Sequence, residues 1–89
     1  MIEELINYYP EEELLKADGF DDAILGVSEQ MNQPVKLIYS VAKCLDILVK
    51  RDGMTTTEAI EFFGFNVSGA YVGEKTPIWC YDAEYFEKW

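Results

Sequence analysis

Residues 40–58, SVAKCLDILVKRDGMTTTE, decide how the rest of this chain can fold. Ser40 is a natural N-cap, because its side chain can accept a hydrogen bond from the first turn of a helix. Apolar side chains then recur at the spacing of one helical face: Val41, Cys44, Leu45, Leu48 and Val49. Gly53 ends this helix, and Thr55 with Glu58 forms a capping box that begins the next. The stretch predicts two amphipathic helices in series, each with an apolar face that must be covered.

Short β-prone runs lie on both sides of this helix pair. Residues 23–27 and 35–39 flank a polar connection and predict a β-hairpin, and residues 78–81 predict a third strand. With two short helices before the hairpin, the element order is α-α-β-β-α-α-β. We therefore expect one small α+β domain over residues 1–89, with a three-stranded antiparallel sheet packed against the helix pair.

The two ends of the chain have their own composition. Residues 1–18 form an acidic helical segment, with helices expected over residues 2–8 and 10–17. Residues 82–89 form a tail of acidic and aromatic residues, which is either a short packed helix or an aromatic arm.

Negative charge is concentrated near the N-terminus. The chain has 17 acidic and 7 basic residues, a net charge of −10, and residues 1–30 hold nine of those acids against one lysine. Such a field attracts basic partners and repels nucleic acid and anionic lipid. The carboxylates expected to meet a basic partner are Glu11, Glu12, Glu13, Asp18, Asp21 and Asp22.

Few residues here carry chemistry. The chain has no histidine, the side chain most used for proton transfer near neutral pH and for holding metals. The three carboxylates of residues 18–22 are able to bind a hard cation, but their spacing does not fit an EF-hand loop, and Asp residues in turns commonly cap backbone N–H groups. We expect no catalytic residue, no metal and no cofactor.

The two cysteines, Cys44 and Cys80, are too few for a disulfide framework. We expect both to be reduced core residues of a cytoplasmic protein. No apolar run approaches the roughly 20 residues that span a bilayer.

Three stretches together resemble a known group of proteins: GFDDAILGV at residues 19–27, YSVAKCL at 39–45 and FNVSGAYVGEKTP at 65–77. The chain resembles small proteins of tailed bacteriophages and marine metagenomes over residues 19–79. The resemblance implies a bacterial or phage-infected cell and implies no activity. Besides Asp21 and Asp22, the polar positions in these stretches that would face a site are Asn66, Tyr71, Glu74 and Thr76.

Three functions fit these observations. We favour a non-enzymatic acidic module, phage-encoded, that docks on a basic surface of a host or phage protein. The first alternative is a homodimeric assembly module, because five Phe, six Tyr and two Trp in 89 residues, with the edges of a small sheet, leave surface to be covered. The second is a small ligand-binding protein or enzyme that uses Asp21, Asp22 and residues 66–76, which a deep pocket joining these segments would favour.

Overall fold

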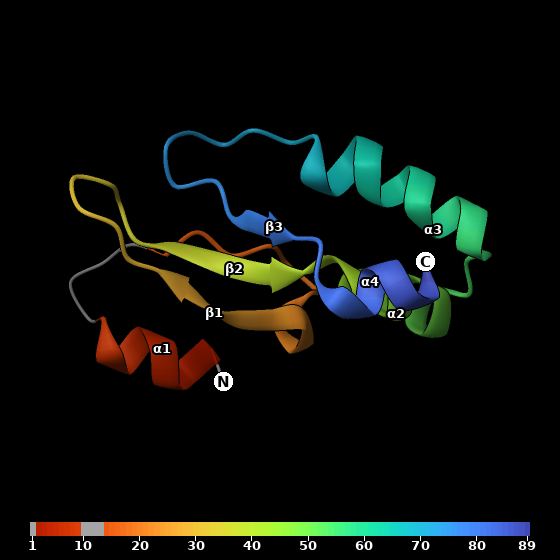
Figure 1. The fold of residues 1–89 in the computed structure, drawn as a ribbon, viewed down its shortest axis with the longest axis horizontal. Coiled ribbons are helices and arrows are strands. Elements are labelled where there is room, and N and C mark those ends of the chain that lie inside the picture. The colour runs from red at the N-terminus through yellow and green to blue at the C-terminus, as the bar shows by residue number, and fades with distance from the viewer. Residues whose placement is uncertain (1, 10–13) are drawn as a thin grey trace.

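A three-stranded sheet in the order β1-β2-β3 lies at the centre of the computed structural model, which describes residues 2–9 and 14–89 (Figure 1). Strands β1 (Ile24–Ser28) and β2 (Lys36–Ser40) form the predicted antiparallel hairpin. Strand β3 (Ile78–Cys80) pairs with the other edge of β2 and runs parallel to it. The sheet is therefore mixed, and the prediction of a wholly antiparallel sheet is wrong. The long helical connection between β2 and β3 returns the chain to the end of the sheet at which β2 begins, as parallel pairing requires.

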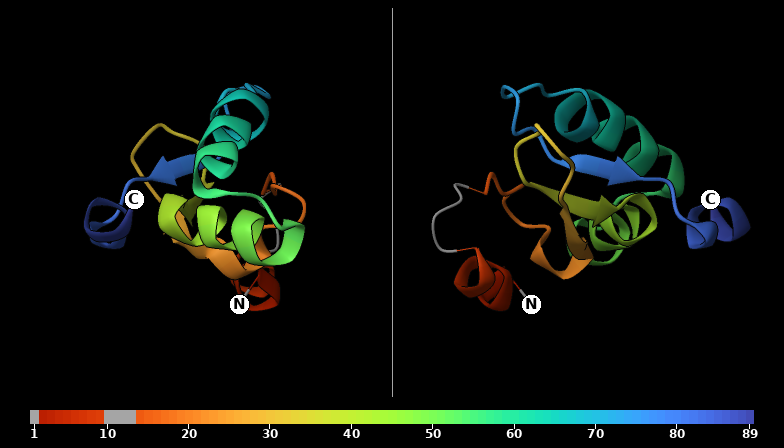
Figure 2. Two further views of the ribbon diagram at one scale, coloured as in Figure 1. Left: turned by 90° about the vertical axis from the view of Figure 1, so that its right-hand side faces the viewer. Right: turned by 60° about the vertical axis from the view of Figure 1, so that its left-hand side comes forward.

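Helices surround this sheet. Those within the described residues are α1 (Ile2–Tyr8), the short 3₁₀ helix η1 (Asp21–Ala23), α2 (Val41–Asp52), α3 (Thr56–Phe62), the π-helix η2 (Phe63–Ser68) and α4 (Ala83–Lys88). In Figure 1, α3 lies above β3, α1 lies beside β1, and α2 and α4 lie at the end toward which β2 points. Two further views agree that α1 and α3 are on opposite sides of the sheet (Figure 2). The domain measures 39 × 23 × 23 Å.

Only part of the predicted second helix, over residues 10–17, lies within the described residues. Residues 10–13 lie outside the described residues, and residues 14–17 are not helical. Instead of bonding within a helix, the Ala17 N–H donates to the hydroxyl of Tyr39 on β2. The C-terminal tail forms the helix α4, which is one of its two predicted forms. The predicted order α-α-β-β-α-α-β does not contain this helix. None of the helices in the described part has the length and hydrophobicity needed to cross a membrane.

Both helix caps predicted from the sequence are confirmed. Ser40 Oγ accepts from the Lys43 N–H at 3.1 Å. Thr55 and Glu58 exchange the two hydrogen bonds of a capping box, at 3.2 and 2.9 Å. Gly53 ends α2 with φ of +69°, a left-handed conformation that costs glycine little.

The core fills the space between the sheet, α2 and α3. Its fully buried side chains include Leu37, Tyr39, Val41, Cys44, Leu45 and Leu48. The Trp79 ring contacts those of Tyr39 and Phe63, at centroid distances of 5.2 and 5.4 Å, so β3 is joined to η2 as well as to β2. Cys44 lies in this core as expected, whereas Cys80 is half-buried, and both thiols are free.

Ser40 joins two helices and is fully buried. Besides capping α2, it donates to Asp82 Oδ2 at 2.6 Å, just before α4. We expect Ser40→Ala to lower the free energy of unfolding by about 2–4 kcal/mol, the sum of a lost cap and a hydrogen bond to a charged group. Urea denaturation measures this, with Thr57→Ala on the exposed surface of α3 as control. Equal losses in the two variants would contradict this role.

Candidate functional site

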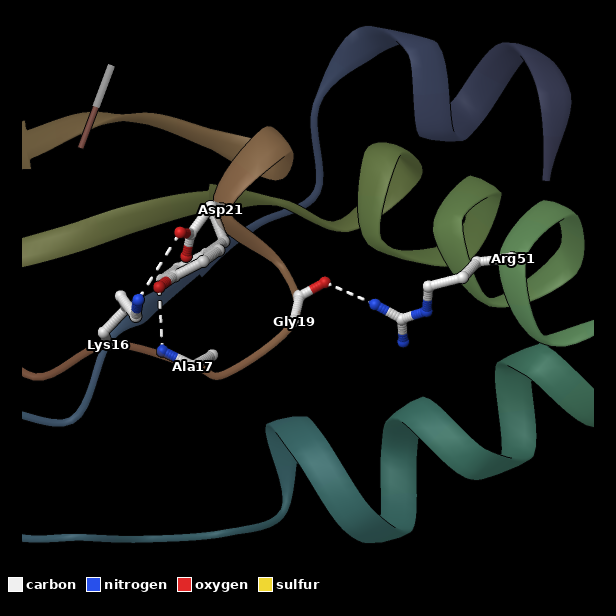
Figure 3. Close-up of polar contacts among 6 residues, drawn as sticks. Lys16, Ala17, Gly19, Asp21 and Arg51 are labelled. Atoms are coloured by element: carbon white, nitrogen blue, oxygen red, sulfur yellow. Dashed lines mark hydrogen bonds and ion pairs between the residues drawn. The ribbon is translucent and has the colours of Figure 1, made fainter. Parts of the chain in front are cut away.

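Two hydrogen bonds from distant parts of the chain hold residues 17–22, here called the acidic turn (Figure 3). The Tyr39 hydroxyl accepts from the Ala17 N–H at 2.8 Å. Arg51, near the end of α2, donates from Nη1 to the Gly19 carbonyl at 2.6 Å. The backbone of the turn is therefore fixed by the sheet and by α2, so that it needs little ordering when the turn meets a partner.

Gly19 and Arg51 fit each other closely. Gly19 has φ of +87°, and a Cβ at this position would lie 3.0 Å from Arg51 Nη1. The same guanidinium lies 5.6 Å from the centroid of the Phe20 ring and pairs with Asp52 at 2.9 Å. The hydrogen bond to Asp52 raises the pKa of Arg51, and in return the pKa of Asp52 is lowered. In the sequence, Arg51 is a cation in the last turn of the helix that Gly53 ends, where it meets the negative end of the helix dipole, and nothing there indicates that it braces the turn.

The carboxylates of the acidic turn have different surroundings. Asp21 Oδ2 pairs with Lys16 Nζ at 3.4 Å, in an exposed contact of the kind that adds little stability. Asp22 is exposed and borders a groove of about 480 Å³ that is also lined by Lys43, Lys50 and Arg51. Asp18 is exposed beside a different, mainly apolar hollow. The turn is thus not one uniform acidic patch, and Glu11, Glu12 and Glu13 lie outside the described residues.

The hollow beside Asp18 joins the acidic turn to η2. Its volume is about 210 Å³. Most of its lining is apolar and includes Phe20, Val67, Ala70, Val72, Pro77 and Trp79. Its polar lining residues are Lys16, Asp18 and Asn66. Of the four predicted polar positions Asn66, Tyr71, Glu74 and Thr76, which all lie in the described part of the chain, Asn66 alone lines this hollow.

The other predicted site positions serve different purposes. Tyr71 is 77% exposed, and Glu74 is exposed too. The Thr76 hydroxyl donates to the Gly73 carbonyl at 2.6 Å and accepts from the Val72 N–H at 2.9 Å, so it closes its own turn. None of these three, nor Asp21 or Asp22, lines the hollow beside Asp18. None of the three hollows described here is lined both by Asp21 or Asp22 and by residues 66–76; the hollow beside Asp18 joins Asp18 and Phe20 to that segment instead.

A second apolar groove, of about 300 Å³, lies along α3 and η2. It is lined by Met54, Glu58, Glu61, Phe62, Phe65 and Asn66, and we call it the α3 groove. In the sequence, Ile60, Phe63 and Val67 continue one apolar face of the second predicted helix, and Phe65 is expected to widen that face. That expectation is wrong: Phe65 is 83% exposed, because it follows buried Phe63 by two residues and so lies on the opposite side of the helix. Gly64 inside the apolar pattern was the signal in the sequence that this helix is irregular.

Chemically reactive groups are scarce in the described structure. Across residues 2–9 and 14–89, no three His, Cys, Asp or Glu side chains are grouped so that they could hold a metal ion. Burial, with a smaller contribution from Asp82, raises the pKa of the Cys44 thiol to about 12. Cys44 is therefore a protonated core residue at neutral pH and a poor nucleophile. Burial likewise raises the pKa of Tyr39, against the effect of its hydrogen bond to Ala17.

Comparison with known proteins gives no match to a family model, to a curated protein or to a solved structure.

Proposed function

We propose that this protein is a non-enzymatic binding module that uses its acidic turn to dock on a basic surface of another protein. The observation that carries the proposal is that the turn is braced by Tyr39 and Arg51 while Asp18 and Asp22 stay exposed. Neither of these two carboxylates takes part in an ion pair or hydrogen bond within the described residues. Two available carboxylates on a braced backbone favour fast and selective association with a basic partner.

The remaining charge of the domain supports the same proposal. Three cations, on Lys16, Arg51 and Lys88, pair with acids in the described structure. Exposed acids without such a pair or hydrogen bond among the described residues are Glu3, Glu4, Asp18, Asp22, Glu61, Glu74, Glu84 and Glu87. The N-terminal end of α1, which carries Glu3 and Glu4, points toward η1 in Figures 1 and 2. A basic partner at the acidic turn would therefore meet further negative charge nearby.

We propose the cytoplasm of a bacterial or phage-infected cell as the setting. The support is the resemblance of residues 19–79 to phage proteins, together with the two free thiols.

A homodimer is a second candidate, which a cluster of aromatic side chains at the C-terminus favours. Tyr81, Tyr85 and Phe86 form edge-to-face contacts at centroid distances of 5.0 and 5.2 Å. Phe86 is 74% exposed, so this cluster presents apolar surface outward. Such a dimer is compatible with docking through the acidic turn.

Affinity capture from a bacterial lysate, followed by binding to the purified partner, tests the docking proposal. We expect Asp18→Lys with Asp22→Lys to weaken binding by about 30-fold or more, because charge pairs at an interface are commonly worth at least about 2 kcal/mol. The matched control is Glu84→Lys with Glu87→Lys on α4, which changes the net charge equally. Retained binding by the turn variant, or equal loss in the control, would contradict the proposal.

A further inference from the structure

We infer that the bound partner presents an amphipathic helix with basic side chains, and that this helix lies across the hollow beside Asp18 and along the α3 groove. The inference rests on the proposed function and adds the surface that is used and the chemistry of the segment that occupies it.

The two depressions are neighbours on one surface. The hollow beside Asp18 and the α3 groove have volumes of about 210 and 300 Å³, and Asn66 lines both. One side of this surface comes from the acidic turn and the other from α3 and η2. Two separate depressions of this kind suit apolar side chains that project from successive turns of one helix, as in helix-in-groove recognition.

Large apolar side chains lie exposed along this surface. Phe65 and Phe62 line the α3 groove, and Val72 lines the hollow. All three side chains are exposed to solvent. Contiguous exposed apolar surface bordered by charged groups marks an interaction site more often than scattered single residues do. Burial of these side chains would supply the affinity that surface charge alone does not.

Phe65 lies in the π-helix η2 and follows buried Phe63 by two residues, on the opposite side of the helix. Segment η2 is six residues long, and it leads directly to Gly69. A Cβ on Gly69 would lie 2.7 Å from the Gly64 carbonyl oxygen, so that only glycine allows the chain to turn this tightly here. π-Helical turns inside α-helices occur frequently at functional sites.

The charges around this surface are complementary to a basic segment. Asp18 borders the hollow, and Glu58 and Glu61 line the α3 groove. Hydrogen bonds from Thr55 lower the pKa of Glu58, which keeps this carboxylate ionised. Among the described residues, Lys16 is the one cation lining either depression, and it pairs with Asp21. The groove beside Asp22 is not complementary to a basic segment, because Lys43, Lys50 and Arg51 line it.

Synthetic peptides of defined chemistry test the inference. The probe is a helical peptide of about 18 residues with leucine on one face and lysine on the other. Two control peptides are used with it. The first has glutamate in place of lysine, and the second has the residues of the lysine peptide in scrambled order. Trp79 lines the hollow and reports binding by fluorescence once Trp89→Phe removes the other of the two tryptophans. We expect saturable binding of the lysine helix, none of the glutamate helix, and at least about tenfold weaker binding of the scrambled peptide. Equal binding of the ordered and scrambled peptides, or absence of binding, would overturn the inference.

Substitution of Phe65 tests where the peptide helix binds. We expect Phe65→Ala to weaken binding of the lysine helix by at least about tenfold, because it removes exposed apolar surface without touching the core. Phe86→Ala is the matched control, since Phe86 is similarly exposed but lies on α4. Unchanged binding of the lysine helix by Phe65→Ala would overturn the inference. Light scattering that shows a wild-type dimer becoming a monomer in Phe65→Ala would also overturn it, because a second copy of the chain would then occupy the groove.

The same variants separate this inference from the proposed function. If the captured partner is lost with Asp18→Lys and Asp22→Lys but binds Phe65→Ala normally, the proposed function stands and the inference is wrong. If the turn variant keeps the partner, the proposed function itself fails.

Discussion

Tyr39→Ala is expected to leave a large fraction of the chain unfolded in the absence of denaturant. Tyr39 is fully buried on the central strand, and its ring packs on Trp79. Truncating a buried aromatic side chain costs about 3–5 kcal/mol, and leaving the Ala17 N–H without its acceptor adds about 1–3 kcal/mol. The whole domain of 89 residues is expected to have only about 4–13 kcal/mol of stability. Circular dichroism during urea titration measures the loss.

Tyr39→Phe separates the ring from the hydroxyl. This variant keeps the packing and removes only the hydrogen bond to Ala17, so we expect it to fold with about 1–3 kcal/mol less stability. Hydrogen exchange should become faster at residues 17–22, because the turn loses one of its two braces. Tyr39→Phe with wild-type stability and unchanged exchange in the turn would contradict the bracing role of the hydroxyl.

High pH is expected to destabilise the fold through Cys44. Below pH 9 the thiol is protonated in both the folded and the unfolded chain, so ionisation of this group does not affect stability. Between pH 9 and about 12 the unfolded chain loses this proton while the folded chain keeps it, because burial raises the pKa of Cys44 from 9.0 to about 12. Linkage converts this difference into a loss of about 4 kcal/mol over that range. Tyr39, whose pKa burial also raises, acts in the same direction above about pH 10.

Urea denaturation at pH 8, 9.5 and 11 measures this dependence. Cys44→Ala is the control, because it removes the titrating group and should flatten the decline between pH 9 and 11 although it lowers stability at every pH. An equally steep decline in Cys44→Ala would show that other groups cause it. Reaction with a thiol reagent gives a second readout: at pH 8 half-buried Cys80 should react in the folded protein and buried Cys44 only after unfolding.

The parts of the fold that local sequence determines were predictable. Helix α2 begins at Ser40 and ends at Gly53 because N-capping and the left-handed C-terminal residue are properties of a few adjacent side chains. The capping box of α3 and the β1–β2 hairpin follow from patterns of the same kind. The direction of β3 was not predictable from residues 78–81 alone, because it depends on the path of the long connection from β2.

The candidate site was predictable only in part. Asp18 and Asp22 were singled out by charge, but their different surroundings come from side chains far along the chain, such as Trp79 beside Asp18 and Lys50 beside Asp22. The brace from Arg51 to Gly19 joins residues 32 positions apart. Phe65 was assigned to the buried face although it lies two residues from Phe63, which places the two rings on opposite sides of a helix. The π-helix itself was not visible in the apolar pattern.

A map of amide chemical shifts during titration with the lysine-rich amphipathic peptide tests the central claim most directly. If the acidic turn and the α3 groove form one docking surface, the shifted amides should cluster at residues 15–20 and 58–66 and at Trp79, and α4 should be unaffected. Shifts confined to α4, or spread evenly over the domain, would contradict this account.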